Sequence, residues 1–228
     1  MDCQQALTTR RGVLRYDSRP VEPTLIEQVL TAAVAAPSPA NLQPWAFVVV
    51  TEPELARRTA HYLIDVQDRG VFQAFLGLQP DETGRYLGLY DLFENAPCFI
   101  VVCNEPKAQF ALPEHEVVLR DWYLMCLGAA TANLMTAATA LGLGTRWFGG
   151  LALDGGGTYL KELLGIPAAV EIAAVTPLGY PADQTPIRPR QPMSRAELAA
   201  FGRGDQPALA SLLRGKLPLD EVVRHNAW

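Results

Sequence analysis

The sequence lacks the residue patterns by which proteins most often bind a metal ion. Its three histidines lie far apart and form no HExxH motif, and no CxxC pair occurs among its four cysteines, which are Cys3, Cys98, Cys103 and Cys126. No GxGxxG motif follows a strand-like run, so a Rossmann dinucleotide site is not supported. We therefore expect no metal site, and we expect the cysteines to be buried free thiols in a reducing compartment.

Basic residues are too few for a protein that binds nucleic acid. Nineteen Lys and Arg residues stand against 24 Asp and Glu residues, which gives a formal net charge of -5. Proteins that follow a phosphate backbone normally carry a basic surplus. The first dozen residues also lack the basic and apolar segments of a signal peptide, so the expected location is cytoplasmic.

One long segment, residues 122–143, contains no charged residue. It is rich in Ala, Thr and Gly rather than in Leu and Ile. This composition favours a fully buried central helix over a membrane span. The sequence therefore predicts no association with a membrane.

Capping residues and helical periodicity predict four helices. The first runs from Asp2, its N-cap, to about Arg10. The second begins at Thr24, where Thr24 and Glu27 form a capping box, and ends before Pro37. Its apolar residues recur at helical spacing and are expected to be buried: Ile26, Val29, Leu30, Ala33 and Val34. The other two are predicted over residues 53–62 and 116–141.

Four short runs of β-branched and apolar residues predict strands over residues 45–51, 98–103, 145–148 and 171–178. Residues 154–157 are glycine-rich and predict a loop. Few strands among long helices predict an α+β fold, specifically a three-layer α/β/α domain. We expect residues 1–228 to form a single domain.

Two segments are expected to leave the core of that domain. Residues 63–95 mix aromatic and polar side chains and predict a helical excursion that forms a lid. Residues 180–228 are rich in proline and predict an extended arm. Such an arm buries little against its own chain, so wrapping a second subunit is a natural use for it.

Two arginine clusters could bind a phosphate group. In the RRGVLR segment, residues 10–15, three arginines surround Gly12, which would let the backbone approach an anion closely. Arg188 and Arg190 are two residues apart, so both point to the same side of an extended chain. Taken alone, each cluster is also consistent with a solvated charged surface.

Two further segments could line a flat polar ligand. In residues 36–50, two prolines fix a turn, and Ser38, Asn41 and Gln43 offer hydrogen-bonding groups just before a strand. In residues 142–150, glycines bracket a strand and could leave backbone N–H groups exposed. Taken alone, the first is equally well explained as a capped connector, and the second is better explained as a glycine-rich turn.

In their order and spacing, these segments together resemble the flavin-binding nitroreductase family. The family's R-R-S-x-R-x-F turn is matched in part by residues 10–16. Its A-P-S-x-x-N-x-Q-P-W-x-F loop is matched over residues 36–47. A long helix leading to G-L-G at residues 142–144, a closing Arg pair and a C-terminal PLDEVVRHNAW segment complete the pattern. The resemblance covers residues 5–228.

The resemblance implies a homodimer with a mostly antiparallel central sheet, a C-terminal arm exchanged between subunits, and two FMN sites at the interface. Arg10 and the Arg188/Arg190 pair would hold the FMN phosphate. The 37–41 loop would approach the flavin from the partner subunit, and a backbone N–H of the 149–150 segment would lie near flavin N5. The expected cofactor-binding residues are Arg10, Arg11, Gly12, Leu14, Pro37, Ser38, Asn41, Phe148, Gly149, Gly150, Arg188 and Arg190.

The implied activity is hydride transfer from NAD(P)H to FMN, and then to a small electrophilic acceptor such as a nitroaromatic or a quinone, in a ping-pong cycle. The same scaffold could instead serve flavin-dependent dehydrogenation, dehalogenation or flavin cleavage, or bind flavin without catalysis. Two departures stand out. Gly12 replaces the usual Ser, and Leu14 replaces the usual Arg or Lys, which should lower the flavin potential unless Arg11, Arg15 or Arg146 substitutes.

Overall fold

The computed structural model describes residues 1–66, 93, 95–105 and 116–182, and further along the chain residues 191–192, 194, 196, 215–216, 218 and 222–223. The chain divides into two compact units. One comprises Met1–Arg69 with Leu89–Thr185, and the other comprises Gly70–Gly88 with Pro186–Trp228. In the second unit, the short strands β5 (Gln191–Pro192) and β6 (Gly215–Lys216) pair in parallel.

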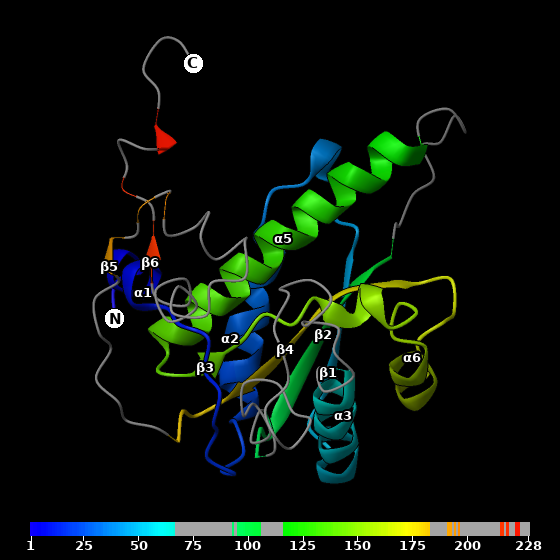
Figure 1. The fold of residues 1–228 in the computed structure, drawn as a ribbon, viewed down its shortest axis with the longest axis horizontal. Coiled ribbons are helices and arrows are strands. Elements are labelled where there is room, and N and C mark those ends of the chain that lie inside the picture. The colour runs from blue at the N-terminus through cyan, green and yellow to red at the C-terminus, as the bar shows by residue number, and fades with distance from the viewer. Residues whose placement is uncertain are drawn as a thin grey trace. The chain divides into compact units, whose positions relative to one another are not determined.

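A four-stranded sheet forms the centre of the first unit (Figure 1). Its strands are, in spatial order, β1 (Trp45–Val50), β2 (Cys98–Asn104), β4 (Glu171–Gly179) and β3 (Gly144–Thr145). Each strand is antiparallel to its neighbour. Every residue of β2 is buried, as expected for a central strand that is covered on both faces.

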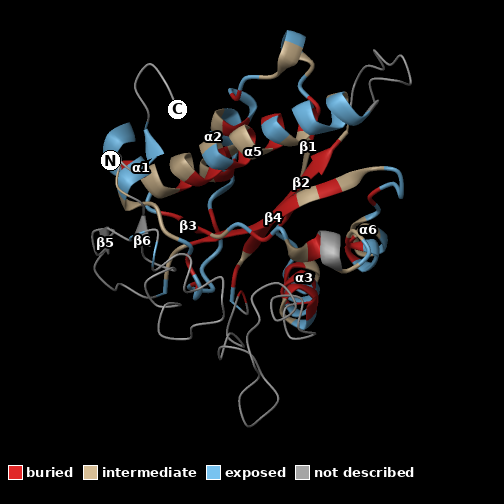
Figure 2. Cartoon of the chain, turned by 45° about the horizontal axis from the view of Figure 1, so that its top comes forward, coloured by how far each residue is buried: buried red, intermediate tan, exposed pale blue. Residues whose placement is uncertain are grey.

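Helices cover both faces of this sheet (Figure 2). One face carries α1 (Cys3–Thr9), α2 (Pro23–Val34) and α5 (Glu116–Ala140), and the other carries α3 (Pro53–Val66) and α6 (Thr158–Leu164). Between α2, β2 and α5, the fully buried side chains of Val29, Ile100 and Leu134 belong to one apolar cluster. The predicted α/β/α fold with an antiparallel sheet is therefore confirmed.

The starts of the first two helices show how well capping can be predicted. The Asp2 carboxylate accepts a hydrogen bond from the Gln5 N–H at 2.8 Å, so the predicted cap of α1 is confirmed. The predicted Thr24–Glu27 capping box is wrong, because α2 begins at Pro23 and its N-cap residue, Glu22, makes no side-chain cap hydrogen bond. Proline has a fixed helical φ and no N–H to satisfy, so it starts the helix one residue earlier.

Three of the five residues predicted to form the buried face of α2 are buried. Ile26, Val29 and Ala33 are buried, whereas Leu30 is half-buried and Val34 is 46% exposed. Val34 is the last residue of the helix, where the chain turns toward the 36–41 loop. The prediction that Val34 is buried is therefore wrong.

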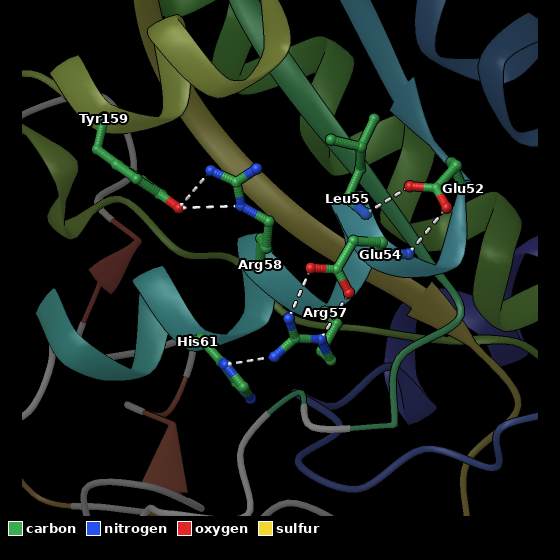
Figure 3. Close-up of polar contacts among 7 residues, drawn as sticks. All are labelled: Glu52, Glu54, Leu55, Arg57, Arg58, His61 and Tyr159. Atoms are coloured by element: carbon green, nitrogen blue, oxygen red, sulfur yellow. Dashed lines mark hydrogen bonds and ion pairs between the residues drawn. The ribbon is translucent and has the colours of Figure 1, made fainter.

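Polar contacts fix α3 at its start and along its length (Figure 3). The Glu52 carboxylate accepts hydrogen bonds from the backbone N–H groups of Glu54 and Leu55 at 3.0 and 2.7 Å. The Arg58 guanidinium donates to the Tyr159 hydroxyl at 3.1 and 3.2 Å, which ties α3 to α6. The sequence reading did not predict α6, although Gly157 and Gly165, both in the left-handed region, bracket it.

The predicted lid falls largely outside the described residues. At its start, α3 continues four residues past its predicted end, to Val66, and Leu63 and Val66 are fully buried. Near its end, Phe93 is fully buried and meets the rings of Phe99 and Phe148 edge-on. These residues belong to the core of the first unit.

The third strand is shorter than predicted. It comprises only Gly144 and Thr145, although Phe148 pairs again with Val175 in the same register. Between these points the register sets Arg146 opposite Pro177, which has no N–H to donate to the ladder. The prediction of a continuous strand over residues 145–148 is therefore wrong, and Arg146 lies in the gap.

Two expectations about buried residues need correction. Cys98, Cys103 and Cys126 are buried free thiols, as predicted, but Cys3 is exposed on α1. Burial raises the pKa of the Cys98 thiol to about 12 and that of the Cys103 thiol to about 11.

The helix α5, which was predicted to be fully buried, is partly exposed in this chain, since Met125 is 64% exposed. In the described part of the chain, no helix combines the length and apolar character needed to cross a membrane.

Candidate functional site

The arginine-rich turn lies along the short strand β3. Gly12 pairs with Thr145, and the Val13 N–H donates to the Thr145 carbonyl at 2.9 Å. A Cβ atom at Gly144 would lie 2.6 Å from Cγ2 of Val13, so the approach depends on glycine at that position. The fold thus brings together two of the predicted motifs that are 130 residues apart in the sequence.

The side chains of this turn differ in their surroundings. Arg10 and Arg11 are half-buried, whereas Leu14 is 40% exposed. Tyr16 is buried and donates its hydroxyl to the Val13 carbonyl at 3.1 Å. Burial raises the pKa of Tyr16 far above its usual range, so its phenol stays neutral. Tyr16 therefore anchors the turn and adds no charge to it.

The predicted residues Phe148, Gly149 and Gly150 follow β3 after two intervening residues, Arg146 and Trp147. Phe148 is buried and exchanges two backbone hydrogen bonds of 2.9 Å with Val175. Gly150 begins the 3-10 helix η4 (Gly150–Leu153), for which Gly149 is the N-cap. Among the described residues, the N–H groups of Gly149 and Gly150 have no hydrogen-bond acceptor. Gly149 is exposed and Gly150 is half-buried.

The loop with Pro37, Ser38 and Asn41 is held rigidly by its own hydrogen bonds. The Ser38 hydroxyl accepts from the Gln43 N–H at 3.0 Å, and the Gln43 side-chain amide donates to the Asn41 carbonyl at 3.3 Å. Ala40, Asn41 and Gln43 all have positive φ angles, of 46°, 57° and 47°. Such angles are costly for residues other than glycine, and clusters of them often occur at functional sites.

An apolar groove of about 420 Å³ lies between this loop and the first half of α5. Its lining residues are Pro37, Ser38, Pro39, Trp122, Met125, Cys126 and Ala129. Trp122 is 43% exposed and Met125 is 64% exposed. Large exposed apolar side chains that share one groove are typical of an interaction surface.

The two halves of the predicted site are far apart within one chain. The loop leads into Trp45, the first residue of β1. Trp45 pairs with Asn104 of β2, and Asn104 pairs with Glu171 of β4. Thr145 pairs with Leu178, seven residues further along β4 and on the opposite edge of the sheet. With strands about 4.8 Å apart and a rise of about 3.3 Å per residue, the separation is on the order of 25 Å. One chain therefore does not bring all the predicted residues to one ligand.

Arg188 and Arg190 lie outside the described residues. In contrast, the structure adds Arg146, which was considered from sequence only as a substitute for a missing cation. A Cβ atom at Gly12 would lie 3.7 Å from Cγ of Arg146, so the arginine stem covers the bare face of Gly12. The sequence feature that could have indicated a role for Arg146 is its position two residues after Gly144, within the glycine-rich segment.

Comparison with known proteins identifies the family. The model of the nitroreductase family matches residues 7–180, and the chain belongs to this family. A protein of Archaeoglobus fulgidus with the provisional name NADH dehydrogenase/NAD(P)H nitroreductase is 32% identical over 80% of this chain and 87% of its own length. An NADH dehydrogenase of Thermus thermophilus is 28% identical over 87% of this chain and 96% of its own. The chain is thus an oxidoreductase.

Solved structures show the same fold at low sequence identity. A nitroreductase from Bacteroides fragilis with bound FMN is 21% identical and has a TM-score of 0.60, with 86% of this chain and 96% of that chain covered. The hypothetical oxidoreductase YcnD from Bacillus subtilis is 23% identical and has a TM-score of 0.63, with 88% of this chain and 79% of that chain covered. At these identities the similarity concerns the fold alone.

Proposed function

We propose that this protein is an FMN-dependent oxidoreductase that passes hydride from NAD(P)H to a small electrophilic acceptor such as a nitroaromatic or a quinone. The observation that carries the proposal is the pairing of Gly12 with Thr145, which sets the arginine-rich turn beside the glycine-rich 144–150 segment. The first segment suits a phosphate, and the second suits a flat ring system.

The described residues fit FMN in their chemistry. Arg10 and Arg11 would bind the phosphate, together with Arg188 and Arg190 further along the chain. The N–H groups of Gly149 and Gly150 would donate to the ring. In the described part of the structure, the buried Thr145 hydroxyl has no hydrogen-bond partner, as is also the case for the Thr59 hydroxyl and the Asn104 side-chain oxygen. The FMN bound to the Bacteroides fragilis nitroreductase of the same fold supports this cofactor.

When bound, FMN supplies the redox chemistry, because it can accept a hydride and later release it. The protein's part is to bind and orient. The backbone at residues 149–150 would offer fixed N–H donors, and a preorganised donor stabilises developing negative charge without rearrangement. We propose that NAD(P)H and the acceptor use one slot in turn, which gives ping-pong kinetics.

We further propose that the protein is a homodimer and that each flavin contacts both chains. The 37–41 loop and the Gly12 turn of one chain are on the order of 25 Å apart by strand geometry, further than one flavin ring reaches. A second copy could bring its loop to the first copy's turn. The exposed groove with Trp122 and Met125 supports burial against that copy, and the proline-rich residues 180–228 would extend the interface.

The purified protein is expected to be yellow, to carry about one FMN per chain, and to elute as a dimer. Anaerobic NADH or NADPH should bleach its flavin absorbance, and a simple quinone or a nitroarene should restore it. Absorbance spectra, light scattering during gel filtration and steady-state kinetics with both substrates varied test these points. Parallel lines in double-reciprocal plots are expected of a ping-pong cycle.

A colourless monomer that takes up no added FMN would overturn the cofactor and the dimer together. Tight FMN that NAD(P)H does not reduce would instead indicate a flavin-binding protein without this activity. Rapid oxygen consumption with loss of the flavin spectrum would indicate flavin cleavage. The flavin absorbance spectrum distinguishes each of these outcomes from the proposed reaction.

A further inference from the structure

Arg146 occupies an unusual place in the sheet. It lies in the gap that Pro177 leaves between β3 and the Phe148–Val175 pair. Its stem lies over Gly12, as the 3.7 Å separation from the position of a Gly12 Cβ shows. The guanidinium is therefore carried at the junction of the two segments that form the candidate site.

This guanidinium is partly withdrawn from water without an acidic partner among the described residues. Arg146 is half-buried, and among the described residues it forms no ion pair or hydrogen bond. Burial lowers the pKa of Arg146, and the smaller opposing effect of nearby Tyr16 does not cancel this shift. Tyr16 is not a counterion, because its phenol is neutral and its hydroxyl donates to Val13. Elsewhere in the described chain, Arg57 and Arg120 pair with Glu54 and Glu171, both at 2.6 Å.

Withdrawing a cation from water costs free energy that a paired anion normally offsets. Three and four residues further along the chain, the N–H groups of Gly149 and Gly150 also have no acceptor among the described residues. Leu14, on the same turn, adds no charge. A half-buried cation among unused donors is typical of a site for an anion.

We propose that Arg146 binds an anionic group of the flavin cofactor, and so provides the charge that Leu14 does not. The inference rests on the proposed function, because it takes FMN as the ligand. Two anionic groups could be its partner, namely the phosphate and the pyrimidine edge of the ring, which becomes negative on reduction. Both are anionic oxygen- or nitrogen-bearing groups that a guanidinium can bind, and the test distinguishes between them.

The test compares Arg146→Met, which keeps an apolar stem without charge, with Arg146→Lys, which keeps the charge. Arg58→Ala is the matched control, since Arg58 lies on α3 and donates only to Tyr159 among the described residues. For each protein, the dissociation constants of FMN and of riboflavin, the midpoint potential of bound FMN and the melting temperature of the flavin-free protein are measured.

If Arg146 binds the phosphate, Arg146→Met should weaken FMN binding about 10- to 100-fold and leave riboflavin binding unchanged. If it faces the ring, the Met variant should bind reduced FMN at least tenfold less tightly relative to oxidised FMN. That change lowers the midpoint potential by about 30 mV per tenfold. In either case Arg146→Lys should keep most of the wild-type value, and Arg58→Ala should match the wild type.

The melting temperature of the flavin-free protein distinguishes a loss of flavin binding from a general loss of stability. Without flavin, Arg146→Met should melt no lower than the wild type, because it removes a cation that has no partner in the described part of the chain. FMN should nevertheless raise its melting temperature less. A Met variant with unchanged affinities and unchanged potential would overturn the proposal. So would one whose flavin-free form melts lower while its flavin binding is intact. A wild type that binds no flavin would instead refute the proposed function itself.

Discussion

Replacing Met125 with glutamate should convert the protein from a dimer to a monomer and strip it of most of its FMN. Met125 is 64% exposed in the single chain and lines the groove beside the 37–39 loop, so a carboxylate there is solvated in the monomer. In a dimer that covers the groove, the same carboxylate would lose its water, at a cost of several kcal/mol without a cation nearby. FMN should leave because the partner's loop would no longer reach it.

Light scattering during gel filtration gives the mass of the Met125→Glu variant, and the flavin absorbance gives its FMN content. Met125→Leu is the control at the same position, and it should remain a yellow dimer because it keeps an apolar side chain. Urea unfolding of the glutamate variant should show a cooperatively folded monomer. A Met125→Glu protein that remains a dimer with full FMN would show that the groove is not the interface.

The sequence predicts most of the regular structure because the length and composition of each apolar segment decide it. The runs in β1, β2 and β4 are too short and too β-branched for helices, and α5 contains no proline. The errors lie where one residue overrides a local pattern. Pro23 displaces the expected start of α2, and Pro177, from a neighbouring strand, shortens β3. The second effect depends on strand register, which a single sequence does not contain.

The candidate site was predictable only as separate motifs. Arginines, glycines and a proline-rich loop each suit a ligand, but the pairing of Gly12 with Thr145 is a tertiary contact between distant segments. The environment of Arg146 was equally hidden, because burial without a counterion depends on what surrounds a side chain. Arg188 and Arg190, outside the described residues, remain predictions from the sequence.

Replacing Gly144 with alanine should destabilise the protein by about 1–3 kcal/mol and weaken FMN binding as well. The added Cβ would lie 2.6 Å from Cγ2 of Val13 and 2.9 Å from its Cβ, so a change of rotamer does not relieve the overlap. The backbone at Val13 must therefore shift, although its N–H is held by the Thr145 carbonyl. Gly12 is its direct neighbour, so the phosphate-binding turn should shift with it.

Two controls separate this local displacement from a general loss of stability. Ile100→Val, in the fully buried centre of β2, should cost about 0.5–1.5 kcal/mol and leave FMN affinity at the wild-type value. Adding Val13→Ala to Gly144→Ala removes the closest atom, so the double variant should be more stable than the sum of the single effects predicts. Urea unfolding and FMN titration measure both quantities. If Gly144→Ala binds FMN as tightly as Ile100→Val does, the turn along β3 does not hold the cofactor, because displacing it then leaves binding intact.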